Sequence, residues 1–154
     1  MNMTQAAVPD AVQPSAQLAR FVAESTWDDI PQPVRHAARR ALLNFFAVAL
    51  SAARTPSMDI ALRTYARFSA GRDASLAGRP DRVDALNAAA LNAMAANVFD
   101  FDDTHHPTII HPTSPIAPVL FALAETRPLT GQQLLHAFVL GVEVACRIGN
   151  AISP

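Results

Sequence analysis

The apolar positions of the chain recur at helical spacing over most of its length. Leu18, Phe21 and Val22 mark the first such pattern, in which apolar side chains return every three or four residues. Prolines and capping residues separate one pattern from the next, as they do at helix ends. We expect helices at residues 14–27, 31–54, 57–69, 84–98, 114–125 and 130–148. The fold class that follows is all-α, a helical bundle of about six helices, with at most a short extended piece at residues 74–78.

Several of these patterns also predict how the helices begin and pack. Residues 42–50 are apolar on nearly every side, so we expect the second helix to be the central helix of the core, surrounded by others. Residues 84–98 are rich in alanine, which favours a helix and permits close helix contact. Thr130 with Gln133 predicts a capping box. Ser114, followed by a proline, predicts an N-cap for the helix before the last.

The composition fits one tightly packed helical domain. Of the 154 residues, 51% are hydrophobic, 16% are charged and five are glycine, and a chain of this length supports a hydrophobic core of its own. Residues 1–13 are polar and interrupted by proline, so we expect them to be a flexible N-terminus. They lack the cationic start and apolar centre of a secretion signal. Residues 14–154 are expected to form the helical domain.

Charge and cysteine content narrow the function classes. The net charge of −1 leaves no basic surface for a phosphate backbone, so we expect no nucleic-acid partner. Cys146 is the single cysteine, which excludes an internal disulfide and fits a reducing compartment. The longest apolar stretch, residues 41–53, is shorter than the ~20 residues that span a bilayer. We therefore expect a cytoplasmic protein without a membrane segment.

Ionisable side chains gather in one stretch, residues 100–114. It holds three Asp, three of the five His, three Thr and one Ser. Imidazoles beside the free backbone N–H groups of a helix start attract an anion, and a small carboxylate substrate would fit. Asp100 could orient His106 or His111, because a carboxylate that accepts a hydrogen bond from an imidazole fixes its tautomer. Three hydroxyl groups add donors: Thr104, Thr113 and Ser114.

Three other interpretations of this stretch stay open. Asp102 and Asp103 could solvate a helix end while the histidines lie on an exposed loop. The order Asp-x-Asp-x-Thr at residues 100–104 also occurs in haloacid-dehalogenase-like phosphatases, but there the first Asp ends a buried strand, and residues 86–94 favour a helix. A metal is the third alternative, although no His-x-x-x-His pair supports it. Its acceptable ligands would be Asp102, His105, His106 and His111.

The order of several motifs resembles the MmgE/PrpD family. The acidic motif at residues 99–105 is followed by His-Pro-Thr-Ser at 111–114, by an apolar run at 118–125 and by Gly-Val-Glu-Val at 141–144. The resemblance covers nearly the whole chain after about residue 17. It implies a large all-helical domain and a smaller lid domain, usually in a homodimer, with the substrate between domains and no metal or other cofactor.

The resemblance also implies a function and a set of site residues. Asp100, Thr104 and His111 match active-site positions of the family and are the catalytic candidates. The implied activity is that of a carbon–oxygen lyase of the 2-methylcitrate dehydratase type that acts on a small di- or tricarboxylate. Family decarboxylases and epimerases are the alternatives. The substrate-binding candidates lie in the same loop: His106, Thr113 and Ser114.

The chain also departs from the family pattern. Asn97 stands where the family usually has a histidine, and Asn44 and Ala47 stand where it usually has Asp and Gly. A second catalytic histidine, the active-site lysines and the lid domain would lie beyond Pro154. We therefore expect an N-terminal portion of a lyase, which pairs as a homodimer or with a complementing C-terminal polypeptide. The alternative is a catalytically inactive remnant or a helical interaction module.

Overall fold

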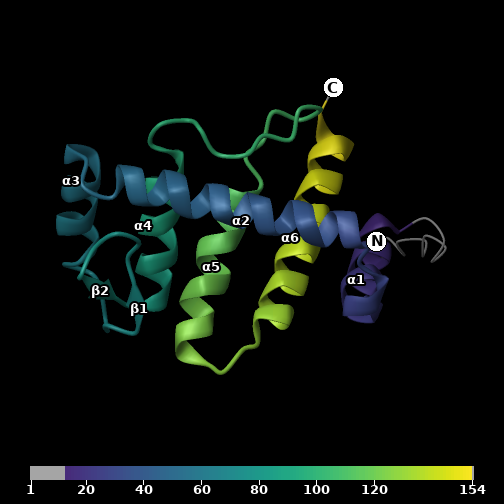
Figure 1. The fold of residues 1–154 in the computed structure, drawn as a ribbon, viewed down its shortest axis with the longest axis horizontal. Coiled ribbons are helices and arrows are strands. Elements are labelled where there is room, and N and C mark those ends of the chain that lie inside the picture. Colours follow the sequence, from purple (N-terminus) through teal and green to yellow (C-terminus); the bar gives the residue numbers. More distant parts are fainter. Residues whose placement is uncertain (1–12, 154) are drawn as a thin grey trace, which may run out of the picture.

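The computed structural model describes residues 13–153, which form six α-helices, one short 3-10 helix and a two-stranded sheet (Figure 1). The elements are α1 (Pro14–Glu24), η2 (Trp27–Asp29), α2 (Gln32–Ala52), α3 (Pro56–Tyr65), β1 (Ala74–Ser75), β2 (Arg82–Val83), α4 (Ala85–Asn97), α5 (Thr113–Thr126) and α6 (Gly131–Ile152). The predicted all-α fold is confirmed. The predicted flexible N-terminus lies, apart from Gln13, outside the described residues.

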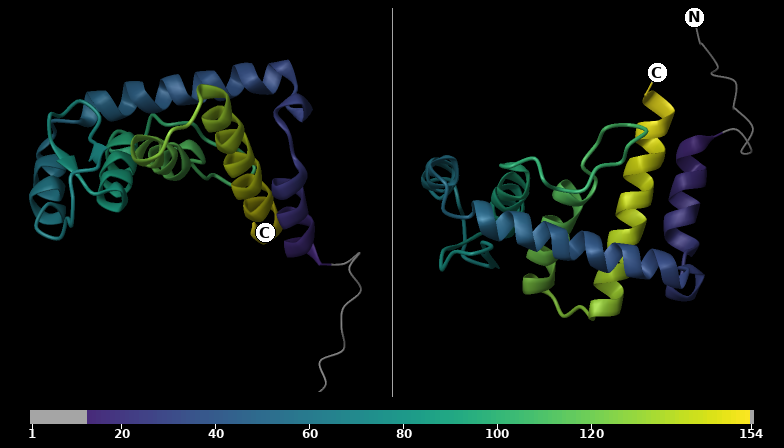
Figure 2. Two further views of the ribbon diagram at one scale, coloured as in Figure 1. Left: turned by 90° about the horizontal axis from the view of Figure 1, so that it is seen from below. Right: turned by 45° about the horizontal axis from the view of Figure 1, so that its top comes forward.

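Helix α2 runs along one side of the other helices and supplies one wall of the core (Figure 2). Its outward face is apolar but open to solvent, since Leu43 is 71% exposed and Leu50 is 52% exposed. The prediction that other helices surround α2 is therefore wrong for the described part of the chain. Buried residues recur every three to four positions along its inward face, and this face packs against α4, α5 and α6. The buried residues of this helix are Ala38, Phe45, Val48, Ala49 and Ala52.

Alanines on α4 let this helix lie close to its neighbours. Ala88, Ala95 and Ala96 are buried together with Leu91, and α4 packs against α5, α2 and α3. The small side chains therefore have the role that the sequence predicts. The two ends of α4 adjoin two irregular connections, one before the helix and one after it.

The connection before α4 is a small antiparallel hairpin of β1 and β2. The predicted extended piece is confirmed over two residues, whereas the partner strand is not apparent from the sequence pattern. Asn92 of α4 holds the hairpin: its amide accepts from the N–H of Ala77 at 2.8 Å and donates to the carbonyl of Ser75 at 3.0 Å. Gly78 has a φ of 72°, a left-handed conformation that glycine adopts without strain.

Side-chain caps begin two helices, of which one was predicted from the sequence. Asp84 accepts a hydrogen bond from the N–H of Asn87 at 3.1 Å and caps α4. Thr130 accepts from the N–H of Gln133 at 3.2 Å, and Gln133 accepts from the N–H of Thr130 at 2.9 Å. The predicted capping box of α6 is therefore confirmed.

Other boundaries differ from the prediction, and α6 runs to Ile152 rather than to residue 148. Helix α1 ends at Glu24 rather than near Trp27, because Asp29 accepts a hydrogen bond from the N–H of Thr26 at 2.7 Å and fixes a separate 3-10 turn. Helix α3 ends at Tyr65 rather than near residue 69, before the chain turns towards β1.

Of the helices between residues 13 and 153, α6 alone is long and apolar enough to cross a membrane, by length and composition. It packs against α5, α2 and η2, with Leu135, Phe138 and Leu140 buried. A core helix has the same length and composition, so this property assigns no membrane location. The absence of a membrane segment stays a prediction.

Candidate acid–base site in the loop before α5

The connection after α4, residues 98–112, is a long loop that folds back on itself. The N–H of His105 donates to the carbonyl of Ile110 at 2.8 Å and closes its outer end. This end reaches the C-terminal part of α6 (Figure 1), where a Cβ on Gly149 would lie 3.1 Å from Cγ2 of Thr108. Glycine at this position of α6 thus permits the close approach of the loop.

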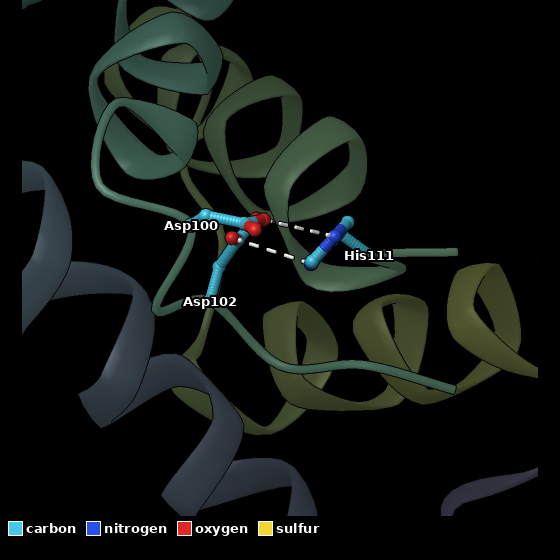
Figure 3. Close-up of side chains that lie close together, drawn as sticks. All are labelled: Asp100, Asp102 and His111. Atoms are coloured by element: carbon cyan, nitrogen blue, oxygen red, sulfur yellow. Dashed lines mark ion pairs between the residues drawn. The ribbon is translucent and has the colours of Figure 1, made fainter. Parts of the chain in front are cut away.

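Two carboxylates of this loop, those of Asp100 and Asp102, face His111 from the same side (Figure 3). Its Nε2 is 3.4 Å from Oδ1 of Asp100, and its Nδ1 is 3.3 Å from Oδ1 of Asp102. The environments of the two carboxylates are opposite, because the side chain of Asp100 is 80% exposed and that of Asp102 is 1% exposed. The Nδ1 contact has ion-pair distance but lacks hydrogen-bond geometry, so this buried nitrogen has no hydrogen bond with any described residue.

Donors from two helices hold the buried carboxylate of Asp102. The hydroxyl of Ser114, in the first turn of α5, donates to its Oδ2. The amide of Asn97, the last residue of α4, lies 3.2 Å from Oδ1 and 3.4 Å from Oδ2. The Asp102 carboxylate is therefore fixed from both sides. The interpretation in which Asp102 solvates a helix end is wrong, because the residue is buried.

Asp103 connects the loop to the start of α5. Its carboxylate accepts from the N–H of Thr113 at 3.2 Å and from the hydroxyl of Thr113 at 2.6 Å, and a negative charge is favourable at a helix N-terminus. Helix α5 consequently begins at Thr113, with Pro112 as N-cap. The prediction of Ser114 as N-cap is wrong, because its hydroxyl binds Asp102 instead.

The structure places the sequence-predicted residues in three ways. Asp100 and His111 come together as expected. Thr113 and Ser114 are buried at 1% and 6% exposure, and their hydroxyls donate to loop carboxylates. Thr104 and His106 are exposed on the loop, outside the Asp100, Asp102 and His111 group.

Two alternative interpretations of the loop can be compared with this geometry. Asp100 follows a helix and not a buried strand, so the phosphatase-like context is absent. The proposed metal-ligand set does not converge, because Nδ1 of His105 pairs with the Thr108 hydroxyl at 2.6 Å and His106 is exposed. Among the described residues, the ligand atoms that do lie within 4.8 Å of one another belong to Asp100, Asp102 and His111. Because Ser114 and Asn97 already engage Asp102, we keep the prediction that no metal binds.

Backbone strain is concentrated in this loop. Asp100 has a φ of 57° and Ile109 a φ of 54°, and they are the two non-glycine residues with positive φ among those described. A β-branched residue such as Ile is a particular outlier there. Strained conformations of this kind cluster at functional sites, which supports the placement of the site in this loop.

The negative charge of the loop also affects the pKa of a side chain on α6. Burial raises the pKa of the Cys146 thiol, and the negative charges of Glu143 and Asp103 raise it further. A thiol with a raised pKa is a poor nucleophile at neutral pH. Cys146 is therefore assigned to packing and not to the chemistry of the site.

Two participants were missed by reasoning from sequence: Asp102 as the second carboxylate of His111, and Asn97 as its donor. The spacing Asp-x-Asp was visible, but nothing in the sequence indicates which of the two carboxylates is buried. Asn97 was visible only as a departure from the family pattern. The structure gives it a role, as a neutral donor to Asp102.

The fold and the site together define an all-α domain that carries an imidazole against two carboxylates in a loop before a helix. The chain belongs to the MmgE/PrpD family, because residues 16–154 match the MmgE/PrpD N-terminal domain.

Curated proteins similar to the chain include cis-aconitate decarboxylases. The mouse enzyme is 41% identical over 86 residues, which are 53% of this chain and 17% of that protein. The human enzyme is 35% identical over 115 residues, which are 71% of this chain and 24% of that protein. The cis-aconitate decarboxylase-like protein oryM of Aspergillus oryzae is 29% identical over 145 residues, 90% of this chain and 30% of that protein. The chain thus spans less than a third of the length of these relatives.

Proposed function

We propose that residues 98–114 supply the proton-transfer group of a lyase that acts on a small di- or tricarboxylate. The observation that carries the proposal is the half-buried imidazole of His111, which lies against the exposed carboxylate of Asp100 and the buried carboxylate of Asp102. An imidazole held by carboxylates suits general acid–base catalysis near neutral pH.

The open side of the site is the side of Asp100. A substrate that approaches there meets Nε2 of His111, while the exposed hydroxyl of Thr104 and ring of His106 are available as donors. The three loop carboxylates repel a polycarboxylate substrate, so its charge must be balanced by cations from outside the loop. In our proposal these come from another part of the full-length protein or from a partner chain.

The similar relatives favour one reaction within this class. Sequence analysis indicates a dehydratase of the 2-methylcitrate type first, whereas the relatives are named as cis-aconitate decarboxylases. In a decarboxylation the C–C bond to the departing CO2 breaks, and the electron pair left on carbon takes a proton from protonated His111. In a dehydration the same ring removes a proton from carbon, the C–O bond of the neighbouring carbon breaks, and the departing hydroxide takes up that proton and leaves as water. Decarboxylation of a cis-aconitate-like substrate is therefore our leading candidate and dehydration the second.

A turnover assay tests this proposal. The full-length protein is incubated with cis-aconitate and with 2-methylcitrate, with EDTA present, and the products are followed by proton NMR. We expect His111→Gln to lower turnover by about 10²- to 10⁴-fold, the usual contribution of a general acid or base. His36→Gln is the control, because His36 is exposed on α2. Equal activity of the His111→Gln protein would overturn the assignment.

The exposed outer face of α2 supports an additional proposal, that this domain pairs with a second copy or with a complementing polypeptide. Leu43 and Leu50 present apolar surface there, and exposed apolar patches mark interaction sites. The double variant Leu43→Glu/Leu50→Glu should shift sedimentation towards the monomer. An unchanged sedimentation coefficient would contradict this role of the face. A cytoplasmic location remains part of the proposal.

A further inference from the structure

Asp102 differs from the other carboxylates of the loop in its surroundings. It is the loop carboxylate removed from water, with 1% of its side chain exposed, and a buried charge is costly unless it is paired and hydrogen-bonded. Here the donors are neutral, the hydroxyl of Ser114 and the amide of Asn97. The ionisable partner that the structure places against it is the ring of His111.

The backbone around Asp102 is fixed as well. The amide of Asn44 on α2 donates to the carbonyl of Phe101 at 3.1 Å, directly before Asp102. Three helices, α2, α4 and α5, therefore set the position of this carboxylate. Asp100, two residues earlier, has an exposed side chain and no comparable set of donors.

A neutral imidazole carries one N–H and one lone pair, and the partner of one nitrogen decides the state of the other. The buried Nδ1 of His111 lies 3.3 Å from Oδ1 of the fixed carboxylate of Asp102, outside hydrogen-bond geometry, and the buried negative charge there favours a proton on Nδ1 over a lone pair. The lone pair is then on Nε2, on the side of exposed Asp100. When Nε2 takes up a proton, Asp100 becomes its partner.

We propose that Asp102, held by Ser114 and Asn97, is the positioning residue that fixes the tautomer of His111 and makes Nε2 the nitrogen that exchanges protons with substrate. This inference rests on the proposed function for the word substrate, but the tautomer itself is a property of the free chain. Asp100 is then the partner of the ring only when Nε2 is protonated, whereas Asp102 is the partner of the ring in both its neutral and its protonated state.

The histidine ring nitrogens report the tautomer directly. Two-dimensional ¹H–¹⁵N spectra of the 154-residue chain, recorded at alkaline pH where the ring is neutral, should show His111 with its proton on Nδ1. In Asp102→Asn the population should shift towards the Nε2–H form. Ser114→Ala and Asn97→Ala should give smaller shifts in the same direction, because each removes one of the donors to Asp102.

Asp103→Asn is the matched control. It removes a loop carboxylate that anchors α5 through Thr113 but is not paired with the ring. If Asp103→Asn shifts the tautomer as much as Asp102→Asn, the effect is loop order and the proposal fails. It also fails if Asp102→Asn leaves the tautomer unchanged while its amide spectrum stays native. If Asp102→Asn does not fold, the smaller shifts of Ser114→Ala and Asn97→Ala decide the matter, and their absence overturns the proposal.

Turnover by the full-length protein separates this inference from the proposed function. Asp102→Asn should lower kcat by at least about tenfold with little change in KM, because a misplaced ring affects the chemical step more than binding. An active His111→Gln protein would sink the proposed function but leave the tautomer result standing. If His111→Gln abolishes turnover but Asp102→Asn leaves it unchanged, this inference alone fails.

Discussion

The two connections that flank α4 contain similar residues, but these residues have different roles. In the hairpin before the helix, the carboxylate of Asp84 accepts from the backbone and side chain of Asn87. In the loop after it, the carboxylate of Asp102 accepts from Ser114 and Asn97. The Asp84 carboxylate caps the start of a helix, whereas the Asp102 carboxylate is buried and faces an imidazole.

The backbone shows the same contrast. The hairpin places Gly78 at its positive φ, while the loop places Asp100 and Ile109 there. Glycine at a positive φ costs little free energy, whereas Asp and Ile at a positive φ store backbone strain of the kind that accumulates at functional sites. The difference teaches that the hairpin serves stability and that the loop holds side chains in positions which stability alone would not select.

Gly78→Ala should give the largest change in stability. The new Cβ would lie 2.8 Å from Cβ of Ala53 at a positive φ, so we expect a loss of about 1–3 kcal/mol in the free energy of unfolding. Gly131→Ala is the control, because a Cβ there meets nothing within 4 Å. Urea unfolding of both variants provides the measurement, and equal midpoints would show that the hairpin tolerates strain as the loop does.

Ile109→Gly should act in the opposite direction and more weakly. The Ile109 side chain is 79% exposed, so little packing is lost, and removing Cβ relieves the left-handed strain. After the entropy cost of glycine, we expect a gain of about 0.5–1 kcal/mol. Ile109→Asn should gain less, since Asn tolerates this conformation only in part. A loss of stability in Ile109→Gly by the same urea assay would mean that the loop is not strained there.

The smallest of the three expected effects on stability comes from the helix cap at Asp84, and it depends on pH. The hydrogen bond from the N–H of Asn87, with further donors, lowers the pKa of Asp84 to about 2 from 3.8. A pKa that is lower in the folded than in the unfolded state gives stability above the unfolded value, and this is lost as pH falls through the folded value. The Tm difference between the wild type and Asp84→Asn should therefore be present at pH 7 and disappear between about pH 4 and pH 2. Asp81→Asn is the control, because the Asp81 carboxylate makes no hydrogen bond with a described residue.

Much of the fold could be predicted because it depends on local pattern. Helical periodicity placed the six helices, and the Thr130 and Gln133 pair placed the start of α6. The second strand and the open face of α2 could not be predicted, because they depend on which elements meet. A run such as residues 42–50 is equally apolar whether one face is covered or all are.

The site divides in the same way. The density of Asp and His in residues 100–114 indicated the candidate loop and offered His106 or His111 as the partner of Asp100, and the structure brings Asp100 to His111. The burial of Asp102 was beyond prediction, because it needs donors from the end of α4 and the start of α5 at once. The same contacts explain why Thr113 and Ser114, which sequence analysis assigned to substrate, have their hydroxyls engaged within the loop.

The most direct test of the central claim, that the loop and not the hairpin is the ligand site, is an NMR titration of the ¹⁵N-labelled chain with cis-aconitate. The account predicts saturable shift changes at Asp100, Thr104 and His111, with the amides of Gly78 and Asp84 unmoved, and their loss in His111→Gln. Shift changes confined to the hairpin, or equal changes in the His111→Gln chain, would contradict it.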